Sequence, residues 1–269
     1  MDRTAGERGR CGGGPGASVA SVNLHRDEEP PVSASGGSGT VFFSGCGLRC
    51  VFCQNFPLSR NAVGRAMSPG ELRDQFLLLE GQGAHNINLV TGTHFIPMIL
   101  EALAGAIKEG LSIPILWNTG GYERIETLRL LDGVVDIYLA DYKFTSPDAA
   151  AQIASAPDYP EVARRALSEM ARQVGPLELD GRGAAEKGLI VRHLVLPGDL
   201  SGTGEVIDFV ARDLPRGVAL SLMSQYTPYA EAHDHALLNR KITKEEYDAA
   251  LNCLDKSGIT TGWIQEMAT

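Results

Sequence analysis

The sequence lacks an apolar run long enough to cross a membrane. Its longest apolar stretches, such as Leu189–Pro197, have the length of a strand, whereas a membrane-spanning helix needs about 20 apolar residues. Arginines near the N-terminus are not followed by an apolar stretch, so no secretory signal peptide is predicted. We therefore expect a cytoplasmic protein that does not bind a membrane.

Basic residues and paired cysteines are also scarce. The chain has 24 Lys and Arg against 33 Asp and Glu, a net charge of −9, which argues against nucleic acid because phosphate binding requires clustered basic side chains. The cysteines number five, and three of them lie within eight residues. A disulfide framework would distribute cysteines in pairs. Reduced thiols in a reducing compartment are the better interpretation.

The first 38 residues differ in composition from the rest of the 269-residue chain. Stretches rich in glycine and serine lie on both sides of Asp27–Pro31. Such compositions favour a flexible chain. We predict a flexible N-terminal arm over residues 1–38, held in part by apolar residues such as Val19, and one α/β barrel domain over residues 39–269.

From Thr40 onward, short β-rich apolar runs alternate with helical patterns, two of which begin with capping boxes, Ser68–Glu71 and Thr243–Glu246. Such alternation indicates βαβ units and a parallel sheet. We predict an α/β fold, a partial (βα)6-type TIM-like barrel with ligands at the carboxyl ends of the strands. The predicted strands are 40–44, 86–90, 113–117, 135–140, 189–196, 217–222 and 261–264. The predicted helices are 68–80, 96–109, 122–131, 160–174, 204–213 and 243–257.

The most informative pattern is a group of three cysteines, Cys46, Cys50 and Cys53, directly after the first of these strands. Gly45 and Gly47 disfavour a helix here, so we predict a loop that surrounds a ligand. Thiolates bind both iron–sulfur clusters and zinc. A third interpretation is that the cysteines are packed as small apolar residues. A zinc ion would need a fourth ligand, for which the candidates are His85, His94 and His193.

The Cys-x3-Cys-x2-Cys spacing, with Phe52 before the last cysteine, resembles the cluster loop of the radical S-adenosylmethionine (SAM) superfamily. In that family three thiolates hold a 4Fe–4S cluster, and SAM binds the remaining iron. Reductive cleavage of SAM then yields a 5′-deoxyadenosyl radical that abstracts hydrogen. The resemblance implies that Cys46, Cys50 and Cys53 are metal ligands and that Phe52 contributes to cofactor binding.

The resemblance covers the chain from Thr40 and is greatest to an uncharacterised branch of proteins similar to pyruvate formate-lyase activating enzyme. Members of this branch carry a further cysteine-rich element upstream, of which Gly6–Cys11 is the similar part. We expect Cys11 not to be a cluster ligand and Cys253, within a helical pattern, to be a packed thiol. The segments that carry the resemblance are Gly39–Cys46, Asn88–His94, Asn118–Tyr122, Val191–Gly198 and Ser221–Pro228.

Polar residues at the ends of four predicted strands complete the site that the resemblance implies. Thr91 lies where the family binds the amino group of SAM, and Asn118 lies where related enzymes have an aspartate of a monovalent-cation site. Asp141 and Lys143 are similar to the Asp-x-Lys of the activating enzymes. Arg192 is implied to reach SAM. By resemblance, all five residues bind cofactor.

Each of these residues also has a purely structural interpretation. The two glycine turns could start helices without any ligand. Asp141 and Lys143 could form a salt bridge inside the barrel, since alternation along a strand directs both to the same side. Arg192 could pair with Asp136 or Asp141. We also expect the loop Gln225–Pro228 at the barrel mouth, where it could contact substrate.

The predicted function is reductive cleavage of SAM for hydrogen abstraction, with activation of a glycyl-radical enzyme as the leading specific reaction. The partners implied are a reductant such as flavodoxin or ferredoxin and a protein substrate, with a monovalent cation as an additional ligand. One alternative is radical SAM chemistry on a small molecule or peptide. Another is a non-catalytic regulatory protein with a cysteine-ligated metal, which would not need charged residues at the strand ends.

Overall fold

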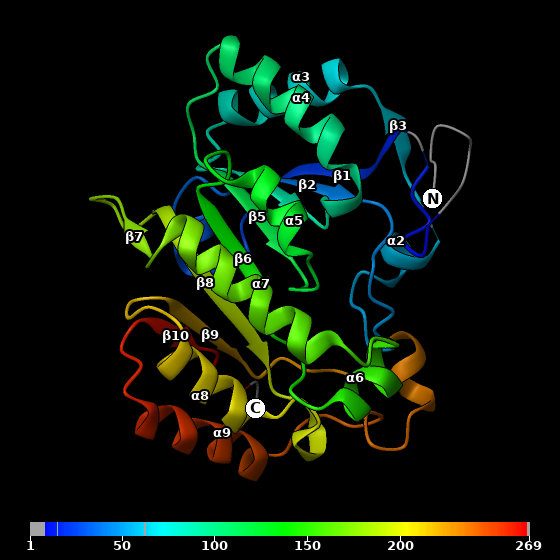
Figure 1. The fold of residues 1–269 in the computed structure, drawn as a ribbon, viewed down its shortest axis with the longest axis vertical. Coiled ribbons are helices and arrows are strands. Elements are labelled where there is room, and N and C mark those ends of the chain that lie inside the picture. Colours follow the sequence, from blue (N-terminus) through cyan, green and yellow to red (C-terminus); the bar gives the residue numbers. More distant parts are fainter. Residues whose placement is uncertain (1–8, 15, 62, 268–269) are drawn as a thin grey trace.

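The computed structural model describes residues 9–14, 16–61 and 63–267. A curved sheet lies at its centre, with the strand order β10-β9-β8-β6-β5-β4-β2-β1-β3 and with β7 paired to β8 (Figure 1). Neighbours from β2 to β10 are parallel. This confirms the predicted α/β fold. The strands are β1 Ala17–His25, β2 Ser38–Phe43, β3 Arg65–Met67, β4 Ile87–Val90, β5 Ile115–Thr119, β6 Ile137–Asp141, β7 Glu178–Leu179, β8 Ala185–Leu194, β9 Ala219–Met223 and β10 Gly262–Ile264.

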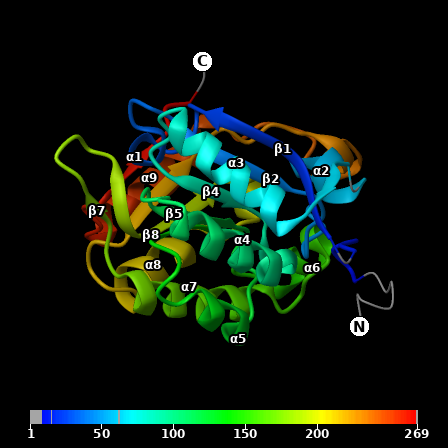
Figure 2. The same cartoon turned by 90° about the horizontal axis from the view of Figure 1, so that it is seen from above.

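Helices follow most of the parallel strands and cover the outside of the sheet (Figure 2). The capping boxes predicted at Ser68 and Thr243 are both formed. Among the described residues, no helix has the length and apolarity of a membrane span. The helices are α1 Pro30–Ser33, α2 Phe56–Arg60, α3 Pro69–Gly81, η1 Thr93–Phe95, α4 Ile96–Lys108, α5 Ile125–Leu128, η2 Arg129–Leu131, α6 Pro147–Ala154, α7 Tyr159–Val174, η3 Pro197–Asp199, α8 Thr203–Asp213, η4 Ala230–Asp234 and α9 Lys244–Ser257.

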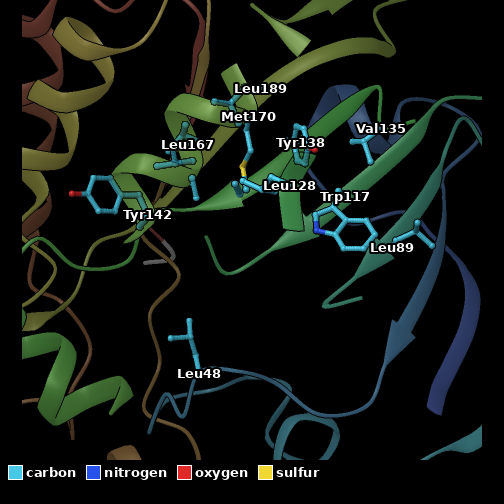
Figure 3. Packing of buried hydrophobic residues seen from close by; sticks show 14 of the residues in the cluster. Leu48, Leu89, Trp117, Leu128, Val135, Tyr138, Tyr142, Leu167, Met170 and Leu189 are labelled. Carbon is cyan, nitrogen blue, oxygen red and sulfur yellow. The ribbon is translucent and has the colours of Figure 1, made fainter. Parts of the chain in front are cut away.

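Side chains alternate between two apolar clusters, one on each face of the sheet. Trp117 and Tyr138 face the helices and pack in the larger cluster, which includes Met170 of α7 (Figure 3). On the inner face, Leu116 and Ile137 pack around Val32 of α1. The inside of the barrel is therefore apolar at its amino-terminal end, and α1 fills it.

The N-terminal segment differs from the predicted flexible arm. Residues 17–25 form strand β1, which pairs antiparallel with β2 and β3, and Val32 of α1 is fully buried. The composition was misleading because only alternate positions face the core, such as Ala17 and Val19, and the positions between carry small or polar residues. Residues 1–8 and 15 of the predicted arm lie outside the described residues.

Two further features of the fold bear on the site. Among the described strands, β10 pairs only with β9 and β3 only with β1, so strand pairing does not close the barrel. Cys253 is exposed on α9, which corrects the prediction of a packed thiol. It lies beside, not within, the packed stripe of the helix, which contains Tyr247 and Ala250.

Candidate active site

The three predicted ligands lie in the loop between β2 and α2, at the carboxyl end of the parallel strands. Cys50 is buried, and Cys46 and Cys53 are half-buried. The loop is not helical, as predicted. Backbone hydrogen bonds to other elements hold the loop in place, and in one of them the amide of Arg49 donates to the carbonyl of Ala154 at 3.1 Å.

Gly45 is required at the start of this loop. Its φ is +89°, and a Cβ there would lie 2.0 Å from the carbonyl oxygen of Cys11. Any other residue would combine a left-handed backbone with a clash. The segment around Cys11 therefore lies directly against the cysteine loop.

The environment of the thiols favours their neutral forms unless a metal is bound. Burial raises the pKa of Cys46 to about 11. Burial also raises the pKa of Cys50 to about 12, although the positive charge of Lys143 opposes this shift. A bound metal would reverse the balance, because coordinating thiols are deprotonated.

The donor set is compatible with an iron–sulfur cluster. Three cysteine thiols lie on one loop, one buried and two half-buried. Iron–sulfur clusters are held by cysteine thiolates. Cys46, Cys50 and Cys53 could therefore hold a 4Fe–4S cluster.

The histidine candidates for a zinc site have other partners. His193 is fully buried, with Nδ1 2.7 Å from the carbonyl oxygen of Tyr142 and Nε2 3.0 Å from Oγ1 of Thr203. His94 Nε2 lies 2.7 Å from the carbonyl oxygen of Ser44 and joins the loop after β4 to the cysteine loop.

Four of the five predicted strand-end residues come together in one network. Lys143 Nζ donates to Asp141 Oδ2 at 2.5 Å, and Arg192 Nε donates to Asp141 Oδ1 at 2.8 Å. Arg192 Nη2 donates to Asn118 Oδ1 at 2.8 Å. The predicted salt bridge of Asp141 with Lys143 is present, and Arg192 pairs with Asp141. Asp136 instead accepts from the backbone amide of Ile115.

Charge pairing fixes the ionisation of this network. Burial alone would raise the pKa of Asp141, but the charges of Arg192 and Lys143 outweigh it and lower that pKa. Burial would lower the pKa of Lys143, and Asp141 raises it instead. Both groups are therefore charged at neutral pH. The Lys143 ammonium has three donors, of which one binds Asp141.

Lys143 lies next to the cysteine loop. A Cβ added to Gly120 would lie 3.1 Å from Leu48 of that loop and 3.6 Å from Cε of Lys143. Thr91, the fifth predicted residue, has a φ of +58°, and its amide donates to the carbonyl of Asn118 at 2.9 Å. Its contact with a cofactor stays a prediction.

Phe52 and Asn118, which were predicted to bind a cofactor and a monovalent cation, contact other protein groups in the structure. The Phe52 ring is buried and packs edge-on against Phe144 and Tyr226, so it anchors the loop in the core. The amide oxygen of Asn118 already accepts from the Arg192 guanidinium, which a monovalent cation would have to replace. Cofactor binding by Phe52 and cation binding by Asn118 remain predictions.

Glu28 and Glu29 are site residues that the sequence did not indicate. Glu28 Oε1 accepts from Asn88 at 3.2 Å and from Asn118 at 3.3 Å, and its Oε2 lies 3.5 Å from Arg192. Glu29 accepts from Ser221 at 3.1 Å and from the indole of Trp263. These carboxylates enter the barrel beneath the charged network. The only sequence signal was the acidic pair before two prolines.

Glu123 is a third such residue. Its Oε1 accepts from Thr93 at 2.5 Å and from Thr119 at 2.6 Å. The side chain is buried, and this burial raises the pKa of its carboxyl group. Glu123 therefore joins the loop after β4 to the loop after β5. In the sequence it resembled the first turn of a helix.

The loop Gln225–Pro228 lies beside the cysteine loop, as its predicted place at the barrel mouth requires. Gln54 Nε2 donates to the carbonyl of Thr227 at 3.4 Å. Tyr226 is buried, and its hydroxyl donates to the carbonyl of Leu238 at 2.8 Å. Substrate contact by this loop stays a prediction.

The cysteine loop thus lies beside charged residues at the strand ends of a partial α/β barrel. The chain belongs to the Radical SAM superfamily, whose family profile matches residues 40–174. An uncharacterised protein of Methanocaldococcus jannaschii is 30% identical over 243 residues, which cover 87% of this chain and 65% of that relative. This chain thus spans less than two thirds of the relative's length. Membership implies a 4Fe–4S cluster and SAM.

Solved structures support the fold. A radical SAM methyltransferase from Sphaerobacter thermophilus superposes with a TM-score of 0.54 at 14% identity, covering 85% of this chain and 66% of the other. SuiB of Streptococcus suis has a TM-score of 0.54 at 12% identity and covers 83% and 47%. A domain of pyruvate-formate lyase-activating enzyme from Bacteroides vulgatus has 16% identity, covers 65% and 93%, and has a TM-score of 0.46. The two structures with TM-scores of 0.54 support the fold and do not identify the reaction.

Proposed function

We propose that this radical SAM enzyme abstracts a hydrogen atom from a protein, as an activating enzyme for a glycyl-radical partner. The main observation in support is that Lys143 lies beside the cysteine loop. Its positive charge opposes the rise that burial causes in the pKa of Cys50. When bound, the cluster supplies the electron that cleaves SAM to methionine and the 5′-deoxyadenosyl radical.

The residues of the chain have separable tasks in this proposal. Cys46, Cys50 and Cys53 hold the cluster. Lys143 directs its remaining N–H donors toward the carboxylate of SAM, since a charge-assisted bond is strong where water is scarce. Asp141 keeps Lys143 charged and in place through the 2.5 Å bond.

The open side of the barrel supports a protein substrate. Strand pairing among the described residues does not close the barrel, and we propose that a peptide segment reaches the mouth on this unpaired side. Fold alone does not determine the substrate, so the reaction has to be tested in two stages.

The first stage tests SAM cleavage. The anaerobically reconstituted protein should be brown and should form 5′-deoxyadenosine from SAM with dithionite. Cys50→Ala should reduce both iron content and product to background, because one thiolate ligand is lost. Cys253→Ala is the matched control, since Cys253 is exposed on α9 and should leave both unchanged. A colourless wild-type protein that holds one zinc would disprove the proposal.

The second stage tests the substrate class. Peptides with deuterated glycine should transfer deuterium to 5′-deoxyadenosine, and an electron paramagnetic resonance spectrum should show a carbon-centred glycyl radical. SAM cleavage without deuterium from any glycine peptide, but with deuterium from a small metabolite, would support the alternative small-molecule reaction.

A further inference from the structure

A cavity opens beside Cys46 and is lined by residues of α2, the cysteine loop and the N-terminal segment. Figure 1 shows α2 and the N-terminal segment on the same side of the molecule. Its volume is about 60 Å³. Three arginines from separate parts of the chain lie in its wall: Arg10, Arg49 and Arg60. Such a concentration of positive charge is unexpected in a protein of net charge −9.

The three arginines of the cavity differ in exposure and in their partners. Arg10 and Arg49 are exposed. Among the described contacts, Arg10 Nη2 donates to the carbonyl of Ser155 at 2.5 Å, and Arg49 Nη2 donates to the carbonyl of Arg10 at 3.3 Å. These acceptors are neutral, so they hold the guanidinium groups in place without cancelling their charges.

The third arginine is partly neutralised. Arg60 Nη2 lies 3.4 Å from Glu231 Oε2, and its side chain is 14% exposed. Arg60 therefore contributes less to the potential outside the protein than Arg10 and Arg49 do. The exposed positive charge at the cavity rests mainly on those two residues.

We propose that Arg10 and Arg49 form the docking surface for an acidic one-electron carrier protein. The inference rests on the proposed function, which needs one electron at the cysteine loop for each SAM cleaved. An acidic carrier would be repelled by a protein of net charge −9 except where positive charge is concentrated. The cavity brings that positive surface to Cys46, so the orienting charge and the point of electron delivery coincide.

The matched variants are Arg10→Glu, Arg49→Glu and Arg216→Glu. Arg216 is exposed and precedes β9, at the end of the parallel strands away from the cysteine loop. The measured quantity is the rate of 5′-deoxyadenosine formation with reduced flavodoxin or ferredoxin, divided by the rate with dithionite. Charge reversal at either docking arginine should lower this ratio about tenfold at low ionic strength, and Arg216→Glu should not.

Salt provides a second readout. The Debye length falls from about 30 Å at 0.01 M to about 10 Å at 0.1 M salt. The carrier-driven rate of wild type should therefore fall as ionic strength rises. The carrier-driven rate of Arg49→Glu should fall less. A ratio of carrier-driven to dithionite-driven rate that is unchanged in both variants would overturn the docking surface. If the ratio is unchanged because both rates fall equally, the arginines act on the cluster site instead.

Direct binding separates this inference from the proposed function. Calorimetry with the oxidised carrier at low salt should give weaker binding to Arg10→Glu than to wild type, whether or not SAM is cleaved. If wild type forms no 5′-deoxyadenosine with dithionite, the proposed function fails. If wild type cleaves SAM with dithionite and binds the carrier no better than Arg10→Glu does, only the docking surface fails.

Discussion

The two ends of the barrel are built differently. At the carboxyl end, the cysteine loop contains buried thiols with raised pKa values and a glycine at φ +89°. At the amino end, Val32 is fully buried in an apolar cluster, and Glu29 is bound by Ser221 and Trp263. The carboxyl end, the mouth of the barrel, is thus suited to a ligand. The amino end, which we call the floor, is completed by Glu29 and Val32 of the protein's own N-terminal segment.

This difference teaches that stability and chemistry are separated along the barrel axis. The floor bridges the two ends of the open sheet, because Glu29 joins the segment after β1 to β9 and β10. The charged network at Asp141 lies at the mouth, since Asp141 is the last residue of β6. Variants of the floor should therefore change unfolding, and variants of the mouth should change ligand binding.

The largest effect on stability is expected at the floor. Val32→Asp would place a carboxylate in the inner apolar cluster, where Val32 is 0% exposed. We expect a loss of about 4 kcal/mol in the free energy of unfolding, because an unpaired charge there cannot be hydrated. Urea unfolding followed by circular dichroism measures the loss.

Val63→Asp is the matched control for this change, since Val63 is 42% exposed, and we expect it to alter the free energy of unfolding by less than about 0.5 kcal/mol. Equal losses in the two variants would mean that α1 is not part of the folded core.

The floor also shows what the sequence could and could not predict. The seven strands and five of the six helices predicted from Thr40 onward match observed elements because each is a local pattern, such as the capping boxes at Ser68 and Thr243. The helix predicted over 122–131 is wrong at its start, because the Glu123 side chain bonds to Thr93 and Thr119 in a loop and only the short α5 and η2 follow. The short elements α2, β3, α6 and β7 were not predicted. The contact between Glu29 and Trp263 joins residues 234 positions apart. No local pattern encodes such a pairing, so a segment that looked like a linker became the floor.

The site was predictable to a similar extent. The spacing of Cys46, Cys50 and Cys53 and the strand-end positions of Asp141 and Lys143 are local features, and the structure brings these residues together. Glu28 and Glu123 were missed because isolated acids resemble ordinary surface or helix-start residues until the tertiary fold buries them.

A second prediction concerns pH and the region between the two ends. Burial lowers the pKa of His193 to about 4 from an ordinary value of 6.5. Below pH 6.5 the unfolded chain binds a proton at this residue that the folded chain does not bind. Stability is therefore lost as pH falls from about 6.5 to about 4, by about 3 kcal/mol in total.

The test compares urea unfolding of wild type and His193→Gln between pH 4.5 and 7.5. The variant should be less stable than wild type at pH 7. Because glutamine cannot titrate, the variant should lose less stability on acidification, and only the carboxylates should contribute to that loss. Identical pH slopes would show that His193 is not the group responsible.

The smallest effect is expected at the mouth, where Lys143 faces the proposed position of SAM. Lys143→Gln removes the ammonium but keeps a polar side chain, and we expect the Kd for SAM of the reconstituted enzyme to rise about tenfold, the loss of one charge-assisted bond. Lys143→Arg retains the charge and should recover part of the affinity.

Lys187→Gln is the control, since Lys187 is exposed on β8, and this change should leave the Kd for SAM unchanged. If Lys143→Gln binds SAM as wild type does but loses stability, Lys143 serves only to neutralise Asp141, and the mouth is then held together by the same kind of internal pairing as the floor.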